Sequence, residues 1–150
     1  MSLLVAGRDD DSSVFTPLFI HQSQWQVNML QRYGNYACVI DATYNTTAYG
    51  LALFMLCVLT NSGYVVVGTF LSVDEQASSI AAGLRMFADR CPEWQPKYFM
   101  SDFSEAQISA AESVFPSKCN RVCCRISKLI VQWRRQKILP AGALPGHYNL

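Results

Sequence analysis

Charged residues are scarce in this sequence. Asp, Glu, Lys and Arg make up 15% of its 150 residues, whereas about a quarter is usual in soluble domains. Hydrophobic residues reach 51%, which excludes a disordered chain, because so much apolar surface can offset the loss of conformational entropy on folding. We therefore predict one globular domain that is either unusually buried or packs against a further surface.

Acidic residues are absent from the C-terminal part of the chain. All eleven Asp and Glu lie in residues 1–117, and residues 118–150 carry only basic charges. These are Lys118, Arg121, Arg125, Lys128, Arg134, Arg135 and Lys137. The net charge of +1 argues against nucleic-acid binding by the whole chain. A basic segment of this kind nevertheless fits either a nucleic-acid contact or a solvated helix.

No leader or membrane-spanning segment is recognisable. The longest apolar run, residues 49–59, is too short to cross a bilayer, which takes about 20 residues. Residues 1–11 lack the basic region and the apolar stretch of a secretion signal. We therefore expect an intracellular protein with no membrane contact, in which the six cysteines are reduced thiols.

The histidines and cysteines have no strong metal-binding spacing. Cys119, Cys123 and Cys124 together with His147 match no zinc template. We expect His21 and His147 to be ordinary surface histidines, because neither has a partner in the sequence pattern.

Hydrophobic periodicity predicts groups of strands and helices after a loose lead-in at residues 1–13. The expected strands are residues 14–20, 36–44, 49–60, 64–73 and 97–100, and the expected helices are 23–33, 74–91 and 104–115. Short turns between strands 36–44, 49–60 and 64–73 imply an antiparallel meander. We expect Asp74 to cap the second helix with Glu75 in its first turn, and Ser104 with Gln107 to form a capping box on the third.

Two aspartates lie in or beside predicted strands. Asp41 interrupts the apolar run 38–44, where a carboxylate is costly unless it is paired, exposed at a strand end or bound to a cation. Asp102 follows the strand at 97–100 and could either bind a metal or cap the next helix. Glu75 could be a third metal ligand, or simply a favourable charge at a helix N-terminus.

Five phrases of the sequence together resemble one protein family. They are Val-Ile-Asp-Ala-Thr-Tyr-Asn-Thr at 39–46, the hairpin at 61–64 that leads to Gly-Thr-Phe-Leu at 68–71, Asp-Glu at 74–75, Ser-Asp-Phe-Ser-Glu-Ala at 101–106, and Ala-Ala-Glu-Ser-Val-Phe-Pro at 110–116. In this order and spacing they resemble the Mutator-like (MULE) transposases, including the host proteins derived from them. The resemblance covers roughly residues 22–117.

The resemblance implies a function as well as a fold. The implied fold is RNase H-like, an α/β mixed sheet with the core order β-β-β-α-β-α, in which the fourth core strand joins the first. The implied site binds Mg²⁺, which prefers carboxylate oxygens, and it cuts and joins DNA. Asp41 and Asp102 would be its catalytic and metal-binding residues, with Glu75 as a weaker candidate. DNA would then be the partner and the nucleus the location.

The sequence departs from the family after residue 116. Family members continue into a strand with a Cys and a His and later supply a catalytic Glu, whereas here no Cys-x-x-His occurs and no Asp or Glu follows Glu112. We therefore expect a lead-in (1–21), a partial core truncated after its second helix (22–117), and a divergent basic tail (118–150) with helical spacing at 126–133. Such a product would arise by truncation or alternative splicing.

Three functional interpretations stay open at this point. The chain could be a transposase core that is inactive alone, since its third carboxylate is missing. It could be a domesticated module that binds DNA or protein without catalysis. It could also be an unrelated α/β domain whose carboxylates are structural. A homo-oligomer is compatible with each, and the sequence names no protein partner.

Overall fold

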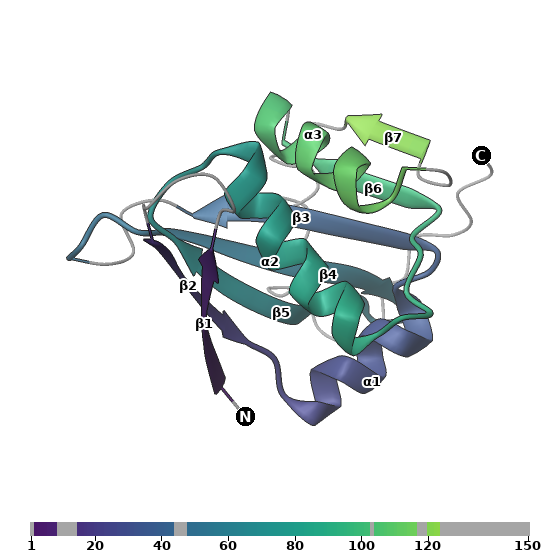
Figure 1. Cartoon of the computed structure of the whole chain (residues 1–150). Helices are drawn as coiled ribbons and strands as arrows, with labels where there is room; N and C mark the ends of the chain where they lie inside the picture. Colours follow the sequence, from purple (N-terminus) through teal and green to yellow (C-terminus); the bar gives the residue numbers. More distant parts are fainter. Residues whose placement is uncertain (1, 9–14, 44–47, 103, 117–119, 124–150) are drawn as a thin grey trace.

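The computed structural model describes residues 2–8, 15–43, 48–102, 104–116 and 120–123. In these residues seven strands form one mixed sheet in the order β1-β2-β5-β4-β3-β6-β7 (Figure 1). The elements are β1 (Ser2–Arg8), β2 (Phe15–His21), α1 (Gln24–Tyr33), β3 (Ala37–Thr43), β4 (Ala52–Thr60), β5 (Gly63–Ser72), α2 (Ala77–Arg90), β6 (Tyr98–Ser101), α3 (Glu105–Val114) and β7 (Asn120–Cys123). The predicted fold class, an α/β mixed sheet with helices, is confirmed. None of the described helices is long and apolar enough to span a membrane.

The antiparallel meander predicted from the short turns is present. β3 pairs with β4 and β4 pairs with β5, both antiparallel. The tight turn between β4 and β5 ends at Gly63, whose φ of 110° suits a residue without a Cβ atom. Along β4, alternate residues from Ala52 to Val58 are buried, as in a strand with one face against the core.

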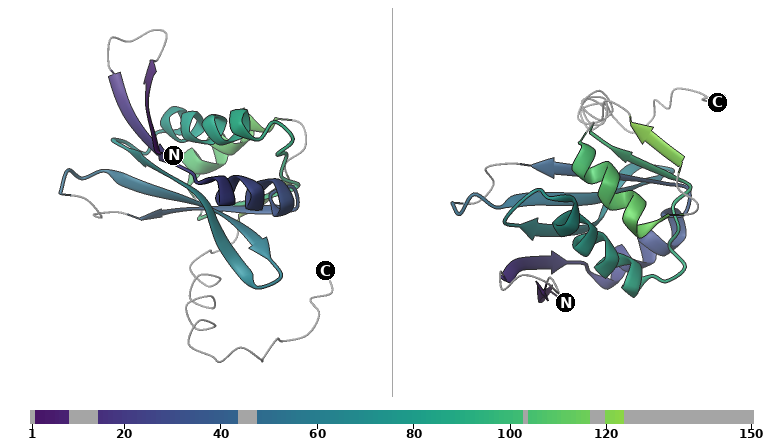
Figure 2. Two further views of the ribbon diagram at one scale, coloured as in Figure 1. Left: turned by 90° about the horizontal axis from the view of Figure 1, so that it is seen from below. Right: turned by 45° about the horizontal axis from the view of Figure 1, so that its top comes forward.

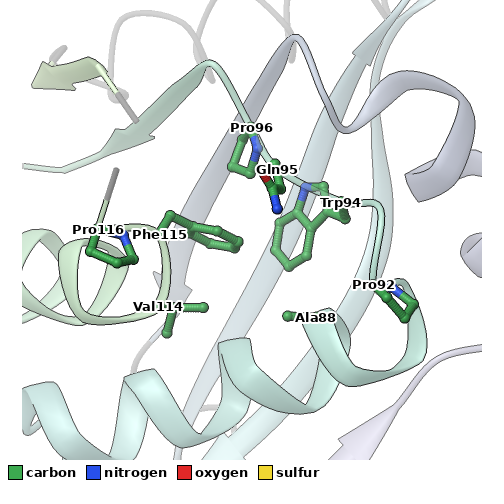
Figure 3. Close-up of a pocket in the computed structure, with 8 residues that line it drawn as sticks. All are labelled: Ala88, Pro92, Trp94, Gln95, Pro96, Val114, Phe115 and Pro116. Atoms are coloured by element: carbon green, nitrogen blue, oxygen red, sulfur yellow. The ribbon is translucent and has the colours of Figure 1, made fainter. Parts of the chain in front are cut away.

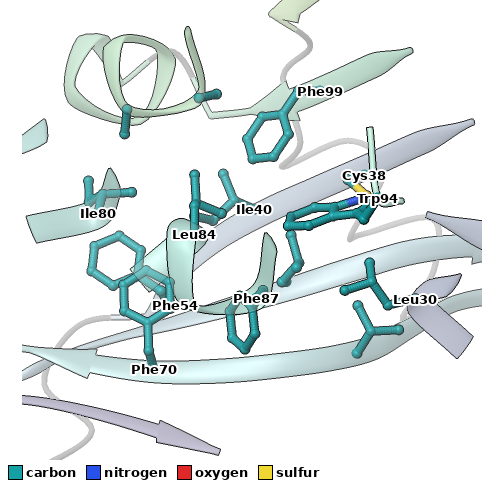
Figure 4. Close-up of a cluster of buried hydrophobic side chains, with 14 of the residues drawn as sticks. Leu30, Cys38, Ile40, Phe54, Phe70, Ile80, Leu84, Phe87, Trp94 and Phe99 are labelled. Carbon is teal, nitrogen blue, oxygen red and sulfur yellow. The ribbon is translucent and has the colours of Figure 1, made fainter. Parts of the chain in front are cut away.

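All three helices lie on one face of the sheet (Figure 2). Buried side chains of α1, α2 and α3 join alternate residues of β4 in one hydrophobic cluster. Within it Phe54 stacks on Phe70 with 4.7 Å between ring centroids, and Phe87 of α2 lies 6.3 Å from Phe70 (Figure 4). Trp94 is buried beside them and donates its indole N–H to the carbonyl oxygen of Gly34. The other face of the sheet, which we call the open face, carries no described helix.

Two glycines bring α2 close to the sheet. A Cβ atom on Gly83 of α2 would lie 2.8 Å from the ring of Phe70, and one on Gly68 of β5 would lie 2.6 Å from the ring of Phe87. Real Cβ atoms do not approach other atoms this closely. At each of these two contacts, the backbone of a glycine in one element packs directly against an aromatic ring of the other element.

Strand β6 joins the sheet beside β3, as the resemblance implied. The two strands are parallel, with Ala37 opposite Tyr98 and Val39 opposite Met100. A parallel neighbour requires a crossover connection, and here the chain between β5 and β6 contains α2. This pairing brings together two segments that lie far apart in the sequence.

The ends of the domain differ from the sequence prediction. Residues 2–8, expected to be loose, form β1, which pairs with β2, and β2 in turn pairs with β5. After α3 the strand β7 pairs in parallel with β6, so the sheet continues past residue 117, where we expected the core to end. Both β1 and β7 are edge strands, whose backbone pairing leaves a weaker trace in the sequence than a buried face does. The predicted helical segment 126–133 lies outside the described residues.

The helix starts are also partly corrected. Asp74 does not cap α2: its Oδ1 accepts the backbone N–H of Gln76 at 3.1 Å, and the helix begins only at Ala77. Glu75 is therefore exposed in the loop before the helix, outside its first turn. Ser104 caps α3 as predicted, by accepting the backbone N–H of Gln107. The second bond of the predicted capping box is missing, since Gln107 Oε1 has no hydrogen-bond partner.

Candidate two-carboxylate site

Asp41 lies in β3 with its side chain toward the open face. The preceding residue, Ile40, is fully buried in the cluster under the helices, and successive residues of a strand point to opposite faces. The residue opposite Asp41 on the neighbouring strand β4 is Met55, which is half-buried. Asp41 is half-buried as well, so its carboxylate stands at the edge of an apolar surface that water can reach.

Asp102 directly follows the strand that neighbours β3. The last pair of the β3–β6 register is Val39 with Met100, and Asp41 and Asp102 each lie two residues further along. Neighbouring strands are about 5 Å apart. If the register continues for these two residues, the aspartates are at the same level and on the same face. Asp102 is exposed.

The helix that follows Asp102 does not use it as a cap. Ser104 occupies the N-cap position of α3, and its hydroxyl makes the side-chain cap bond. The capping role that the sequence left open for Asp102 therefore belongs to Ser104. The backbone of Asp102 remains between the end of β6 and the start of α3, where its side chain is accessible to solvent.

The negative charge of Asp41 affects the pKa of the nearby Cys57 thiol. Cys57 of β4 is the partner of Val39 in the antiparallel register, so it is a diagonal neighbour of Asp41 on the open face. Burial, and secondly the negative charge of Asp41, raise the pKa of the Cys57 thiol to about 12. Sequence reasoning missed this neighbour, because the predicted meander says which strands pair but does not give the register that places Cys57 opposite Val39.

Glu75 is not brought beside the two aspartates in the sheet. It follows β5, and β5 is separated from β3 by the whole width of β4. The loop that contains it leads to α2, which lies on the face opposite to the open face (Figure 2). Glu75 is exposed, so its place fits the alternative of a solvated charge near the helix start.

The other sequence candidates form no site in the described part of the chain. No group of three His, Cys, Asp or Glu side chains there could hold a metal ion. His21 ends β2 and is half-buried rather than fully at the surface. Of the cysteines considered for zinc, Cys119 and Cys124 lie outside the described residues, as does His147.

A separate pocket lies on the helix side of the molecule. It has a volume of about 390 Å³ and lies between the C-terminal ends of α2 and α3 and the loop before β6 (Figure 3). Trp94 and Phe115 form part of its wall, with ring centroids 4.9 Å apart, and three prolines line it as well. None of the described residues that line it is ionisable, so these residues supply no acid, base or metal ligand.

The comparison with known protein families agrees with this geometry. A family model described as "MULE transposase domain" matches residues 37–127, more than half of the chain. The chain belongs to the MULE transposase family. No curated protein matches the sequence.

The matched part of the MULE transposase domain begins at the first residue of β3 and extends past β7. It therefore includes the meander, the α2 crossover, both aspartates and the strand that the sequence analysis had assigned to the tail. The elements β1, β2 and α1 precede the match. The strands β1 and β2 belong to the same sheet as the matched strands, and Ile20 of β2 and Leu30 of α1 belong to the same core.

Proposed function

We propose that this MULE transposase domain descends from a metal-dependent enzyme that cut and joined DNA, and that the catalytic site of the present chain is incomplete. The observation that carries the proposal is the pairing of β3 with β6, which supports Asp41 and Asp102 as one carboxylate pair. The strand order β5-β4-β3-β6-β7 also supports an RNase H-like core. DNA as partner and the nucleus as location follow from this descent.

The two aspartates suit one hard divalent cation. Carboxylate oxygens are preferred ligands of Mg²⁺, which keeps several waters, and both side chains lie where water reaches them. Their neighbours Met55 and Cys57 are poor ligands for such an ion, so Asp41 and Asp102 would hold it. A bound ion would supply Lewis-acid polarisation of a phosphate oxygen. The half-buried Asp41 would fix the position of the ion against the sheet.

The proposed site lacks what a full reaction requires. DNA strand transfer uses two ions about 4 Å apart that clamp the attacking and leaving oxygens. Two carboxylates can place one ion, but the second needs a further ligand. No Asp or Glu follows Glu112 in the sequence, and Glu75 lies beyond β4. We therefore expect weak metal binding without DNA cleavage.

The test is metal binding, with DNA cleavage measured on the same samples. Mn²⁺, followed by its paramagnetic resonance signal and displaced by Mg²⁺, should bind the whole chain with about one ion per chain. Asp41→Asn and Asp102→Asn should each weaken binding by roughly ten- to a hundredfold or more, the loss typical of even outer-shell partners. The matched control is Asp89→Asn, because Asp89 is exposed on α2, on the opposite side of the sheet.

Two results would contradict the proposal. If all three variants bind Mn²⁺ as the wild type does, Asp41 and Asp102 form no metal site. If the wild type cuts or joins DNA with Mn²⁺ or Mg²⁺, and both aspartate variants do not, the site is complete and the expected inactivity is wrong.

A further inference from the structure

Aromatic and basic side chains meet at the starts of β3 and β6. Tyr36 precedes β3, and Lys97 and Tyr98 stand at the beginning of β6. This is the end of the two strands opposite to Asp41 and Asp102, because β3 and β6 are parallel. We call Tyr36, Lys97 and Tyr98 the tyrosine–lysine platform. The sequence analysis did not find it, because its members come together only through the β3–β6 register.

The contacts in the platform leave one ring accessible. The rings of Tyr36 and Tyr98 meet edge to face, with 5.6 Å between centroids and 74° between planes. The Nζ of Lys97 lies 5.3 Å from the centroid of the Tyr98 ring. Tyr36 is 53% exposed, although a tyrosine ring usually buries much of its area in a core or an interface. A flat aromatic surface is thus presented to solvent next to a cation.

Backbone hydrogen bonds hold the platform in place. The N–H of Lys97 donates to the carbonyl oxygen of Asn35, and that of Tyr98 to the carbonyl oxygen of Tyr36, both at 3.0 Å. The N–H of Gln95 donates to Asn35 Oδ1 at 2.7 Å. Three hydrogen bonds therefore connect the segment that carries Tyr98 to the segment that carries Tyr36. A ligand that binds here would not have to order them, which lowers the entropic cost of binding.

The sequence segments that carry the platform contain few acidic residues. Arg32 lies near the platform in sequence, with its guanidinium carbon 5.5 Å from the centroid of the Tyr33 ring. Residues 12–40 and 94–101 contain no Asp or Glu, and the acidic neighbour in sequence is the exposed Glu93. An anionic ligand at the platform would thus meet Lys97 without a carboxylate from these segments.

We propose that the tyrosine–lysine platform binds single-stranded DNA. A base stacks on the exposed ring of Tyr36, and Lys97 attracts the neighbouring phosphate. Stacking on aromatic side chains combined with cations along the backbone is how proteins hold single strands without reading sequence. A duplex does not fit this mode, because the faces of its bases are already stacked on one another.

The platform and the carboxylate pair share the same two strands. Between Ala37 and Asp41 the strand rises by about 13 Å, at roughly 3.3 Å per residue. A single strand that ran from the platform along β3 would reach the level of the proposed metal site within a few nucleotides. The proposal rests on the proposed function for its choice of DNA, but the binding itself needs no metal.

The experiment measures binding of a fluorescent oligothymidine to the whole chain by anisotropy, in EDTA and at low salt. Tyr36→Ala should weaken binding roughly tenfold, within the range for loss of one stacked base, and Tyr36→Phe should restore it. Lys97→Gln should lower the slope of log affinity against log salt by about 0.7, the value for one phosphate contact on a single strand. The matched control is Tyr49→Ala, since Tyr49 is an even more exposed tyrosine, at 88%.

Several outcomes would overturn the proposal. One is equal binding by Tyr36→Ala, Tyr49→Ala and wild type, and another is tighter binding of the same sequence as a duplex. An oligouridine that binds more tightly than the oligothymidine would overturn the assignment to DNA. Asp41→Asn separates the two proposals: it should bind oligothymidine as the wild type does in EDTA, whether or not it has lost Mn²⁺ binding.

Discussion

Gly83 occupies the position where α2 has no room for a side chain. An alanine there gains about 1 kcal/mol of helix propensity, but its Cβ would lie 2.8 Å from the Phe70 ring. That ring cannot move away easily, because it is buried and Phe54 stacks against it. Overpacking of this kind costs about 1–3 kcal/mol. We predict that Gly83→Ala lowers the free energy of unfolding by roughly 1 kcal/mol net, as measured by urea denaturation.

Ser78 provides the matched control for this substitution. It is exposed in the first turn of the same helix, and Ser78→Ala should change the stability by no more than about 0.5 kcal/mol. Phe70→Leu should make the Gly83→Ala change less costly, because a smaller side chain then faces the new methyl group. A Gly83→Ala variant more stable than wild type would show that helix propensity outweighs the contact.

Cys57 makes a second residue-scale prediction, on the effect of pH. Its pKa in the folded protein is raised from 9.0 to about 12, by burial and then by Asp41. A raised folded-state pKa stabilises the protein fully below the unfolded pKa, and this stabilisation is lost as pH rises from about 9 to about 12. The stability advantage of wild type over Cys57→Ala should therefore shrink above pH 9, by at most about 1.4 kcal/mol per pH unit.

The same measurement in the Asp41→Asn background checks the cause. Without the carboxylate the folded-state pKa of Cys57 should be raised less, so the advantage over Cys57→Ala should shrink over a narrower pH range. A difference between wild type and Cys57→Ala that stays constant from pH 8 to pH 11 would contradict the raised pKa.

At the scale of the element, α2 begins without a side-chain cap. Gln76 has the extended backbone of an N-cap, with φ −70° and ψ 149°, but makes no cap hydrogen bond. Serine at this position can accept a backbone N–H of the first turn, and it adds no charge beside Asp74 and Glu75. We predict that Gln76→Ser raises the free energy of unfolding by about 0.5–1 kcal/mol, read from thermal or urea unfolding. Gln76→Ala is the control and should give no such gain; equal effects of Ser and Ala would exclude capping.

The elements also show which local signals can be read from sequence. The turn at Gly63 and the apolar strands around it were predicted correctly, because both rest on neighbouring residues. The start of α2 was predicted wrongly, since Asp74 has the right chemistry for a cap but bonds within the loop, to Gln76. The edge strands β1 and β7 were missed, because their pairing depends on β2 and β6 rather than on their own pattern.

At the scale of the whole molecule, the decisive feature is the position of β6 between β3 and β7. Hydrophobic periodicity and short turns predict the three strands of the meander, but they do not indicate which strand is the parallel neighbour of β3. That neighbour was predicted from the family resemblance, which also implies that Asp41 and Asp102 belong to one site. The tyrosine–lysine platform depends on the same register, yet no single phrase around Tyr36 or Lys97 indicates it. Long-range pairing is thus what sequence reasoning could predict only by analogy.

The parallel pairing of β3 with β6 also implies an order of events during folding. The β3–β4–β5 meander joins residues close in sequence, whereas pairing of β6 with β3 joins Ala37 to Tyr98 and so closes a much longer loop, at a greater entropic cost. We expect the meander to form in the folding transition state and β6 to dock afterwards. Phe54→Leu should then mainly slow folding, and Phe99→Leu should mainly speed unfolding, in stopped-flow measurements; the reverse pattern would contradict this order. On this order Asp102 would come level with Asp41 only in the last stage, so a partly folded nascent chain would hold neither the proposed metal ion nor the proposed single strand.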